Sequence, residues 1–334
     1  MTEPHGMIPS LMKSSPESPR IAILLPCFNE VLTIAKVVGD FKEQIPESTV
    51  YVYDNNSTDG TDEIALKAGA IVRHEKRQGK GFVVNRMLDE IDADVYLMAD
   101  GDDTYPADRA RDMIAPILDG RADMVVGNRL VTYGDHSFRP LHVFGNQLVV
   151  RSINVIFGST VHDVMSGYRA MSHEFVNKIP IISKGFEIET EITLQALYRN
   201  FVIEEVPVAY GQRPTGSFSK LHTIRDGFRV LLKIGDIFKA YRPLLFFFLI
   251  AGFVALAGLI LGSIPILEFI RTGRILHFPT AILAAAIEIV AVILLGCGLI
   301  LDSTNHHFRE VSQLVLKAAR GAHSRLENEK PPTR

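Results

Sequence analysis

Acidic side chains gather where an apolar run of the sequence ends. The run Val95–Ala99 is followed by Asp-Gly-Asp-Asp at residues 100–103. Like charges at the end of a buried strand cost free energy, but they become favourable around a divalent cation, because hard cations prefer carboxylate oxygens. The alternative is a solvated turn with a capping Asp before a helix over Pro106–Leu118. This segment alone leaves the two interpretations open.

The elements that must position this cluster alternate between short apolar runs and helix-like stretches over residues 21–127. The predicted strands are Ile21–Leu25, Val50–Tyr53, Ile71–Arg73, Val95–Ala99 and Met124–Val126. The predicted helices are Glu30–Gln44, Thr61–Ala68, Gly79–Ile91 and Pro106–Leu118. Such alternation predicts an α/β domain with a Rossmann-like, mostly parallel sheet.

Polar clusters follow four of the predicted strands. PCFNE comes after the first strand, DNNSTDGT after the second, DGDD after the fourth and GNR after the fifth. Ligands of parallel sheets bind beyond the carboxyl ends of the strands, so we expect the four clusters on one rim. This convergence favours the metal-site interpretation. The sequence has neither Gly-x-Gly-x-x-Gly nor a Walker lysine pattern, so it does not support dinucleotide or P-loop sites.

Composition excludes some classes of protein. The net charge of -3 argues against a nucleic-acid partner. Cys27 and Cys297 lie far apart in apolar segments, which indicates neither a disulfide framework nor a metal knuckle. Residues 1–20 are polar and contain four prolines, so we expect a disordered arm and not a signal peptide.

Two apolar segments in the C-terminal third predict a transmembrane hairpin. Residues 244–264 carry no charged side chain, and residues 278–301 carry only Glu288. Each segment can cross a hydrocarbon core of about 30 Å as a helix. A pair of buried core helices is the alternative interpretation. Glu288 is costly in lipid, so it is expected to face protein, and another subunit is one candidate.

Basic residues predict the orientation. Lys and Arg precede the first apolar segment and follow the second, which favours both ends in the cytoplasm and a cytoplasmic N-terminal domain at the inner or plasma membrane. Residues 220–243 are basic with apolar residues at helical spacing, which predicts an amphipathic helix in the headgroup layer. A packed core helix is the alternative there. Residues 305–327 predict a second amphipathic helix.

Taken together, the motifs resemble family 2 glycosyltransferases of the GT-A fold. The segments that carry the resemblance are ILLPCFNE, VYVYDNNSTDGT, RQGKGFVVN, ADGDDTYP, VVGNR, DVMSGYRAM, GFEIETEI and EVPVAYGQRPTGSFSKL. Within that family they are similar to polyisoprenyl-phosphate glycosyltransferases such as dolichol-phosphate mannose synthase and bacterial undecaprenyl-phosphate glucosyltransferases. The resemblance covers roughly residues 20–242 and implies a GT-A catalytic domain over residues 21–219.

The resemblance implies an activity and its partners. A hexose would pass, with inversion, from a nucleotide diphosphate sugar, best UDP-glucose, to undecaprenyl or dolichyl phosphate at the cytoplasmic membrane face. The acceptor phosphate is already ionised near neutral pH, so positioning and charge stabilisation matter more than a general base. Membrane lipid is a further partner, and a homo-oligomer such as a tetramer is compatible with the sequence.

The resemblance also implies the donor side of the site. The nucleotide-binding residues would be Pro26, Asn29, Glu30, Asp54, Asn55 and Lys80. Relatives usually have two acids where this chain has Asp54-Asn55, which leaves open which of the two reads the base. For Asn29 the alternative is capping of the next helix, and the basic loop around Lys80 has the alternative of an exposed charge run.

The family's Asp-x-Asp is matched by Asp100 and Asp102, which implies bound Mg²⁺ or Mn²⁺ and a catalytic role for Asp102. Thr104 stands where relatives often have Gln. Asp103 is expected to lie beside the metal ligands without binding the metal.

The transfer side rests on further residues. Asp163 and Glu189 would be catalytic, with a buried Asp163–Arg169 ion pair as the alternative for Asp163. Arg129 would bind lipid phosphate; Arg139, His142 and Asn146 are further candidates. If GFEIETE is helical, Glu187 and Glu191 share a face and Glu189 points elsewhere. Arg213 and Lys220 lie in a Gly/Pro/Ser loop that would close over the diphosphate, or else rest on the membrane.

Two other functions remain alternatives. A non-catalytic membrane scaffold built on a transferase fold would be supported by loss of the Asp-x-Asp, which is intact here. A nucleotidyltransferase acting on lipid phosphate would keep a nucleotide-like rim without this order of motifs.

Overall fold

The computed structural model describes residues 18–129, 140–183, 185, 187–211, 235–236 and 238–328. The chain divides into two compact units, Met1–Thr223 and Ile224–Arg334. Each unit is described by itself. The expected disordered arm lies almost wholly outside the described residues, and so does most of the helix expected at residues 220–243.

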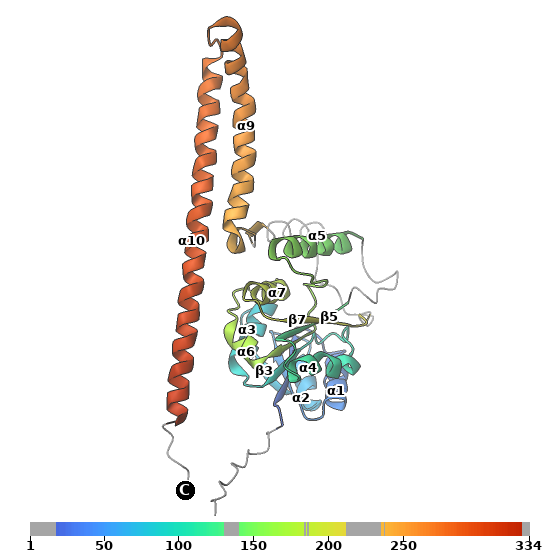
Figure 1. The fold of residues 1–334 in the computed structure, drawn as a ribbon. Helices are drawn as coiled ribbons and strands as arrows, with labels where there is room; N and C mark the ends of the chain where they lie inside the picture. The colour runs from blue at the N-terminus through green and yellow to red at the C-terminus, as the bar shows by residue number, and fades with distance from the viewer. Residues whose placement is uncertain are drawn as a thin grey trace, which may run out of the picture. The chain divides into compact units, whose positions relative to one another are not determined.

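The first unit is built on one seven-stranded sheet (Figure 1). Its strands are β1 (Ile21–Cys27), β2 (Thr49–Asp54), β3 (Ile71–His74), β4 (Val95–Met98), β5 (Met124–Asn128), β6 (Arg169–Ser172) and β7 (Ile203–Pro207). They lie in the order β3-β2-β1-β4-β6-β5-β7, and β6 alone runs antiparallel to its neighbours. The predicted mostly parallel α/β sheet is confirmed.

Helices cover both faces of the sheet (Figure 1). The helices of this unit are α1 (Ile34–Gln44), α2 (Thr61–Lys67), α3 (Lys80–Glu90), α4 (Ala110–Leu118), α5 (Pro140–Phe157), α6 (His173–Lys178) and α7 (Ile188–Tyr198), and a 3₁₀ turn, Ala107–Arg109, precedes α4. Apolar residues of α1, α2 and α4 pack on one face, while those of α3, α6 and α7 pack on the other. In β1, Ile21 and Ile23 face the first layer whereas Ala22 and Leu24 face the second, so this strand is apolar throughout.

The topology decides which loops meet. β1, β2 and β4 are parallel, and β5 points the same way because β6 is antiparallel to both β4 and β5. The carboxyl ends of these four strands therefore share one edge, as the sequence predicts. Because β6 is reversed, its beginning lies at that same edge, and it brings the segment Asp163–Tyr168 there.

The second unit contains two long helices, α9 (Pro243–Thr272) and α10 (Phe278–Asn328). Both are long and apolar enough to cross a membrane. Large apolar side chains such as Phe253 and Val292 are exposed along them, which is unfavourable in water and suits lipid. Helix α9 continues past the predicted span through Pro265, and residues 305–327, expected as a separate helix, continue α10 without a break.

Glu288 of α10 faces α9 of the same hairpin. A Cβ added at Gly258 would lie 2.5 Å from Glu288 Oε1, so only glycine leaves room for the carboxyl group in this position. Glu288 Oε1 is buried and has no hydrogen-bond partner within the described part of the chain. The carboxyl group thus faces protein within its own chain, as its cost in lipid predicts.

Candidate active site at the carboxyl edge of the sheet

The loop after β1 is bound to the loop after β2. Backbone amides of residues 29–31 donate to side-chain oxygens of residues 57–61 at 2.9 to 3.1 Å. In return, Asn29 Oδ1 accepts the amide of Thr58 at 2.9 Å. These bonds hold residues 29–31 outside the helix, which begins at Ile34 and not at the predicted Glu30. Asn29 therefore joins two loops of the rim, and it does not cap α1.

Asn55 organises the neighbouring basic loop. Its Nδ2 donates to the carbonyl oxygens of Glu75 and Arg77 at 3.0 and 2.8 Å, and its Oδ1 accepts the amide of Gly79 at 2.8 Å. The Arg77 guanidinium itself returns to the Glu75 carboxylate, with Nε 3.0 Å from Oε1. The side chain of Asn55 thus stabilises the conformation of the loop that precedes Lys80.

Asp54, at the end of β2, differs from Asn55 in the hydrogen bonds of its side chain. Its Oδ2 accepts the amide of Ser57 at 3.0 Å. Its Oδ1 is buried and has no hydrogen-bond partner among the residues that the structure describes. An unsatisfied buried acceptor is costly unless a ligand supplies a donor. Asn55 uses its side chain within the protein, whereas Asp54 has a carboxylate oxygen available to an N–H or O–H group of a ligand.

Lys80 joins two carboxylates at the centre of the rim. Its Nζ lies 2.5 Å from Asp100 Oδ1 and 2.5 Å from Glu189 Oε1. These residues come from the start of α3, the end of β4 and the first turn of α7. Gly167 packs against the cluster so closely that an added Cβ would lie 3.0 Å from Asp100 Oδ2. A side chain at position 167 would therefore press on the carboxylate of Asp100.

The carboxylates of the cluster keep its amine charged. Burial by itself lowers the pKa of the Lys80 amine, but the carboxylates of Asp100 and Glu189 more than offset burial, and the pKa rises above its usual value. Lys80 is therefore charged near neutral pH. Within this trio the carboxylates outnumber the amine two to one, and the buried Arg169 guanidinium also interacts with Glu189. Asp102, two residues beyond Asp100, is a further carboxyl group in the same loop.

The acids of the DGDD segment point in different directions. Asp102 is only 1% exposed, and its Oδ1 accepts the Thr104 hydroxyl at 2.5 Å and the Thr104 amide at 3.2 Å. Asp103 has a left-handed backbone, with φ of 59°, and its Oδ1 lies 2.8 Å from Lys36 Nζ. The segment is thus neither a solvated turn nor a helix cap, because Asp100 and Asp102 are both held within the rim.

The donor set fits a hard divalent cation. Asp100, Asp102 and Thr104 offer only oxygen atoms, which Mg²⁺ and Mn²⁺ prefer. Over the described ranges, no group of three or more His, Cys, Asp and Glu side chains could hold a metal ion by itself. Mg²⁺ commonly takes one or two protein carboxylates and completes its shell with substrate phosphates and water. The residues therefore suit a cation that binds together with a phosphorylated ligand.

Asp163 forms a buried ion pair, but its partner is Arg129 and not Arg169. Arg129 Nε lies 2.7 Å from Asp163 Oδ2, and Nη2 lies 3.0 Å from Oδ1. The Arg169 guanidinium instead donates to the carbonyl oxygens of Ser166 and Val164 at 2.8 and 2.9 Å. The reason is topological, because Arg169 is the first residue of β6 and is fully buried, whereas Arg129 follows β5 at the rim.

The three glutamates that precede and begin α7 have separate surroundings. Glu187 is the N-cap residue of the helix, Glu189 binds Lys80, and the Glu191 carboxylate accepts the amides of Ile182 and Ser183 at 3.0 and 2.7 Å. Helical spacing turns Glu189 away from the other two, as the sequence predicts.

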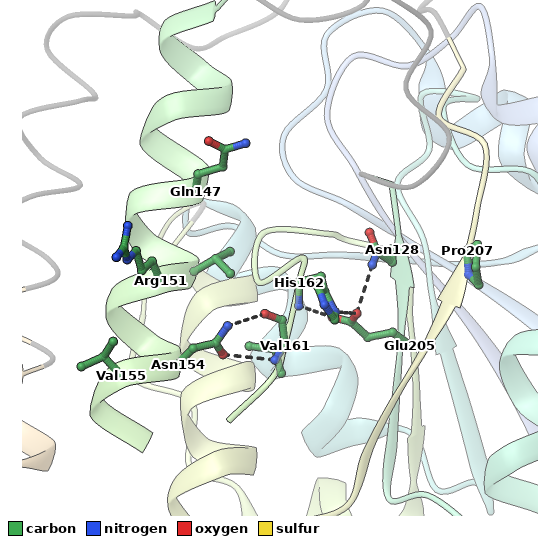
Figure 2. A pocket seen from close by; sticks show the side chains of 10 residues that line it. Asn128, Gln147, Arg151, Asn154, Val155, Val161, His162, Glu205 and Pro207 are labelled. Carbon is green, nitrogen blue, oxygen red and sulfur yellow. Dashed lines mark hydrogen bonds and ion pairs between the residues drawn. The ribbon is translucent and has the colours of Figure 1, made fainter. Parts of the chain in front are cut away.

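A cavity of about 940 Å³ opens beside the Arg129–Asp163 pair (Figure 2). It is lined by Asn128 of β5, by α5 residues including Arg151 and Val155, by His162, and by Glu205 of β7. Asn154 holds its wall together, donating to the carbonyl of Val161 at 2.8 Å and accepting its amide at 3.1 Å (Figure 2). Since residues 129 and 163 directly follow two of the lining residues, the cavity adjoins the ion pair.

The remaining predicted residues either lie near the end of β1 or have side chains that the structure does not describe. Pro26 and Glu30 lie half-buried at the end of β1, beside the loop of residues 57–61. Arg139, Arg213 and Lys220 lie outside the described residues. His142 and Asn146 fall in α5, where the structure describes the backbone and not these side chains.

Two residues of this site, Glu205 and His162, were not predicted from the sequence. Glu205 lies in the quoted segment EVPVAY, and a strand prediction for that segment would have placed alternate residues on opposite faces. Its acidic side chain beside the rim was therefore available as a signal. His162, one residue before Asp163, had no distinguishing neighbour in the sequence.

These features define an α/β fold whose site, at the carboxyl edge, suits a phosphorylated ligand and a cation. Residues 22–180 match the family described as glycosyl transferase family 2. The chain is 36% identical over 289 residues to glycosyltransferase AglJ of Haloferax volcanii, covering 86% of this chain and 94% of that protein. The chain therefore belongs to glycosyl transferase family 2.

Two further similarities agree with this assignment. The dolichyl-phosphate hexose transferase of Haloferax volcanii is 31% identical over 193 residues, which are 58% of this chain and 83% of that protein. The crystal structure of Mycobacterium tuberculosis glucosyl-3-phosphoglycerate synthase with Mn²⁺ and UDP-glucose superposes with a TM-score of 0.51 at 21% identity, covering 66% of this chain and 78% of that chain. The predicted GT-A fold is confirmed, followed by two apolar helices.

Proposed function

We propose that this glycosyltransferase transfers a hexose from a nucleotide diphosphate sugar to a polyprenyl phosphate at the membrane surface, with UDP-glucose as the leading donor. The observation that carries the proposal is the cluster of Lys80, Asp100 and Glu189 beside buried Asp102. An intact, carboxylate-rich cluster of this kind favours an enzyme over a scaffold. The names of relatives, which include a dolichyl-phosphate hexose transferase, support the acceptor class.

The donor nucleotide would lie over the ends of β1 and β2. The open Oδ1 of Asp54 is suited to an N–H group of the base, whereas the side chain of Asn55 is engaged by its own loop, which supports Asp54 as the residue that reads the base. Asn29 and Asn55 would hold the two loops around the nucleotide, and Pro26 and Glu30 would border it. Lys80 would hold Asp100 and Glu189 in place near the diphosphate.

Asp100 and Asp102 would hold Mg²⁺ or Mn²⁺. When bound, the cation supplies Lewis-acid stabilisation for the charge that develops on the leaving diphosphate. Glu189, fixed by Lys80, would accept hydrogen bonds from sugar hydroxyls. Asp163 would orient Arg129 rather than abstract a proton, because a phosphate acceptor is already ionised.

The acceptor phosphate would meet Arg129, and its isoprenoid chain would lie in the cavity beside α5. Asp163 engages Nε and Nη2 of the guanidinium, and an arginine has five N–H donors in all. The remaining donors suit phosphate oxygens. Arg213 and Lys220 stay candidates for closing the site over the diphosphate. The apolar hairpin would anchor the enzyme in the membrane, with the catalytic unit in the cytoplasm.

The test is transfer of radiolabelled sugar into organic-extractable lipid. Purified full-length protein is incubated with undecaprenyl phosphate, Mn²⁺ or Mg²⁺, and a panel of nucleotide sugars. Label in lipid from one donor, dependent on the cation, is the expected result and names the sugar. Label from the nucleotide moiety in place of the sugar would support nucleotidyl transfer. No lipid product from a folded protein would support the scaffold.

A further inference from the structure

Glu205 of β7 collects four hydrogen bonds from residues around the Arg129–Asp163 pair. Its Oε1 accepts the backbone amides of His162 and Asp163 at 2.7 and 3.2 Å. Its Oε2 lies 3.0 Å from Asn128 Nδ2 and 2.7 Å from His162 Nδ1 (Figure 2). One oxygen therefore binds the backbone before β6, and the other binds side chains at the end of β5 and in the loop.

This carboxylate fixes the place of Asp163. The segment of residues 159–168 links α5 to β6 without regular structure, so nothing in a helix or sheet ladder holds the Asp163 amide. Glu205 accepts that amide, and Asp163 in turn binds both Nε and Nη2 of Arg129. The chain of contacts runs from β7 through the loop to the guanidinium.

The neighbouring residue shows that the arrangement is specific to one face of β7. Glu204 points to the opposite face, where its two carboxylate oxygens each lie 2.9 Å from Arg121 Nη1 at the protein surface. Glu205 has only 16% of its side chain exposed and lines the cavity. A carboxylate this enclosed costs free energy unless its donors are well placed.

We propose that Glu205 is a positioning residue for the acceptor: it holds the His162–Asp163 backbone so that Asp163 presents Arg129 to the acceptor phosphate. The inference rests on the proposed polyprenyl-phosphate transfer. Glu205 does not touch the reacting atoms. Its effect is confined to the acceptor side, because Asp54, Lys80 and Asp100 belong to other loops.

The test compares Glu205→Ala, Glu205→Gln and the control Glu204→Ala in full-length enzyme. Glu205→Ala is expected to lower kcat/KM for undecaprenyl phosphate by about 10- to 100-fold, since small misplacements of a site residue cost that much. The Kd for UDP should stay within about twofold, as expected for separate sites. Glu204→Ala should match the wild type in both measurements.

Glu205→Gln separates geometry from charge. Its carbonyl oxygen can accept both backbone amides, so this variant should retain most of the activity that Glu205→Ala loses. Equal losses in the two variants, with both proteins folded, would overturn the proposal, and so would a parallel loss of UDP binding in Glu205→Ala. If Glu205→Ala does not fold, the activity of Glu205→Gln decides alone.

A double-mutant cycle with Asp163→Asn tests the route. If Glu205 acts through Asp163, adding Glu205→Ala to Asp163→Asn should lower kcat/KM by less than about twofold more. Losses that multiply in full would overturn the route through Asp163.

Binding separates this inference from the proposed function. Affinity for farnesyl phosphate, measured without donor, should weaken in Glu205→Ala and not in Glu204→Ala. A wild-type protein that binds farnesyl phosphate but forms no lipid product would contradict the proposed transfer and leave the positioning role standing. A wild-type protein that neither binds nor transfers would overturn both.

Discussion

Two ion clusters meet at the carboxyl edge of the sheet, and they differ in how their charges balance. Around β4, the Lys80 ammonium faces two carboxylates, Asp100 and Glu189, with Asp102 close by. Beyond β5, Arg129 and Asp163 pair one to one. In the first cluster the carboxylates outnumber the amine, which suits a divalent cation. In the second the charges pair one to one, so the arginine is held in place and its remaining donors are oriented. An excess of carboxylates thus distinguishes the proposed donor side from the paired charges of the proposed acceptor side.

The largest effect should come from removing the positively charged side chain of each cluster. Lys80→Met and Arg129→Met each leave buried carboxylate without its partner, at a cost of about 3–5 kcal/mol. Mn²⁺ should restore part of the lost stability in Lys80→Met, because a metal ion held by Asp100 and Asp102 offsets part of the carboxylate charge that the missing ammonium leaves behind. It should not do so in Arg129→Met. Thermal unfolding of the solubilised full chain, with and without Mn²⁺, makes the comparison. Equal rescue of both variants would show that the clusters do not differ as described.

The next effect concerns the excess of carboxylates itself. Asp102→Asn keeps the acceptor for Thr104 but removes one negative charge, and it should lower kcat by about 100- to 1,000-fold, the range for one missing electrostatic contact. Mn²⁺ binding followed by electron paramagnetic resonance should weaken in parallel. The control is Asp108→Asn, because Asp108 lies shortly after the acidic segment and its side chain is exposed. Full activity in Asp102→Asn would remove this residue from the metal site.

A smaller effect should separate Asp54 from Asn55. Asp54→Asn should weaken UDP binding by roughly tenfold or more, as for the loss of a charged hydrogen bond, with little change in melting temperature. Asn55→Ala should instead lower stability by about 1–3 kcal/mol, since it strands polar groups of the loop at residues 75–79. Titration calorimetry and thermal melts measure the two effects. The reverse pattern would assign base recognition to Asn55.

The smallest effect lies in the hairpin, where the enclosed carboxyl group of Glu288 faces the backbone at Gly258 and not a basic side chain. Gly258→Val should destabilise the hairpin by about 1 kcal/mol or slightly more, because the new side chain displaces Glu288. Gly252→Val is the matched control, since a Cβ at Gly252 would meet nothing within 4 Å. Resistance to unfolding in detergent distinguishes the two variants. Identical behaviour would show that the Gly258–Glu288 approach is unimportant.

Local sequence patterns predicted much of this site, because the carboxyl ends of parallel strands lie at the same edge of a sheet. The apolar runs predicted β1 to β5, and polar residues at their ends had to share an edge. The pattern failed where chain direction changes. The segment Arg169–Ser172 is a short strand that runs antiparallel between β4 and β5, and no local periodicity of the sequence predicts its direction. The helix α5 was also not predicted, although its first residue, Pro140, is of a type that often begins helices.

Local patterns in the chain predicted the fold class, the rim, the acidic segment at residues 100–103 and the two apolar helices, because each depends on short-range periodicity or on runs of one residue type. The pairings of charged side chains became visible only in the folded chain. Lys80 with Asp100 and Glu189, Arg129 with Asp163, and Glu205 with the His162–Asp163 backbone all join residues at least 20 positions apart. Charge and residue type show that such side chains need partners, but the order of the strands chooses them.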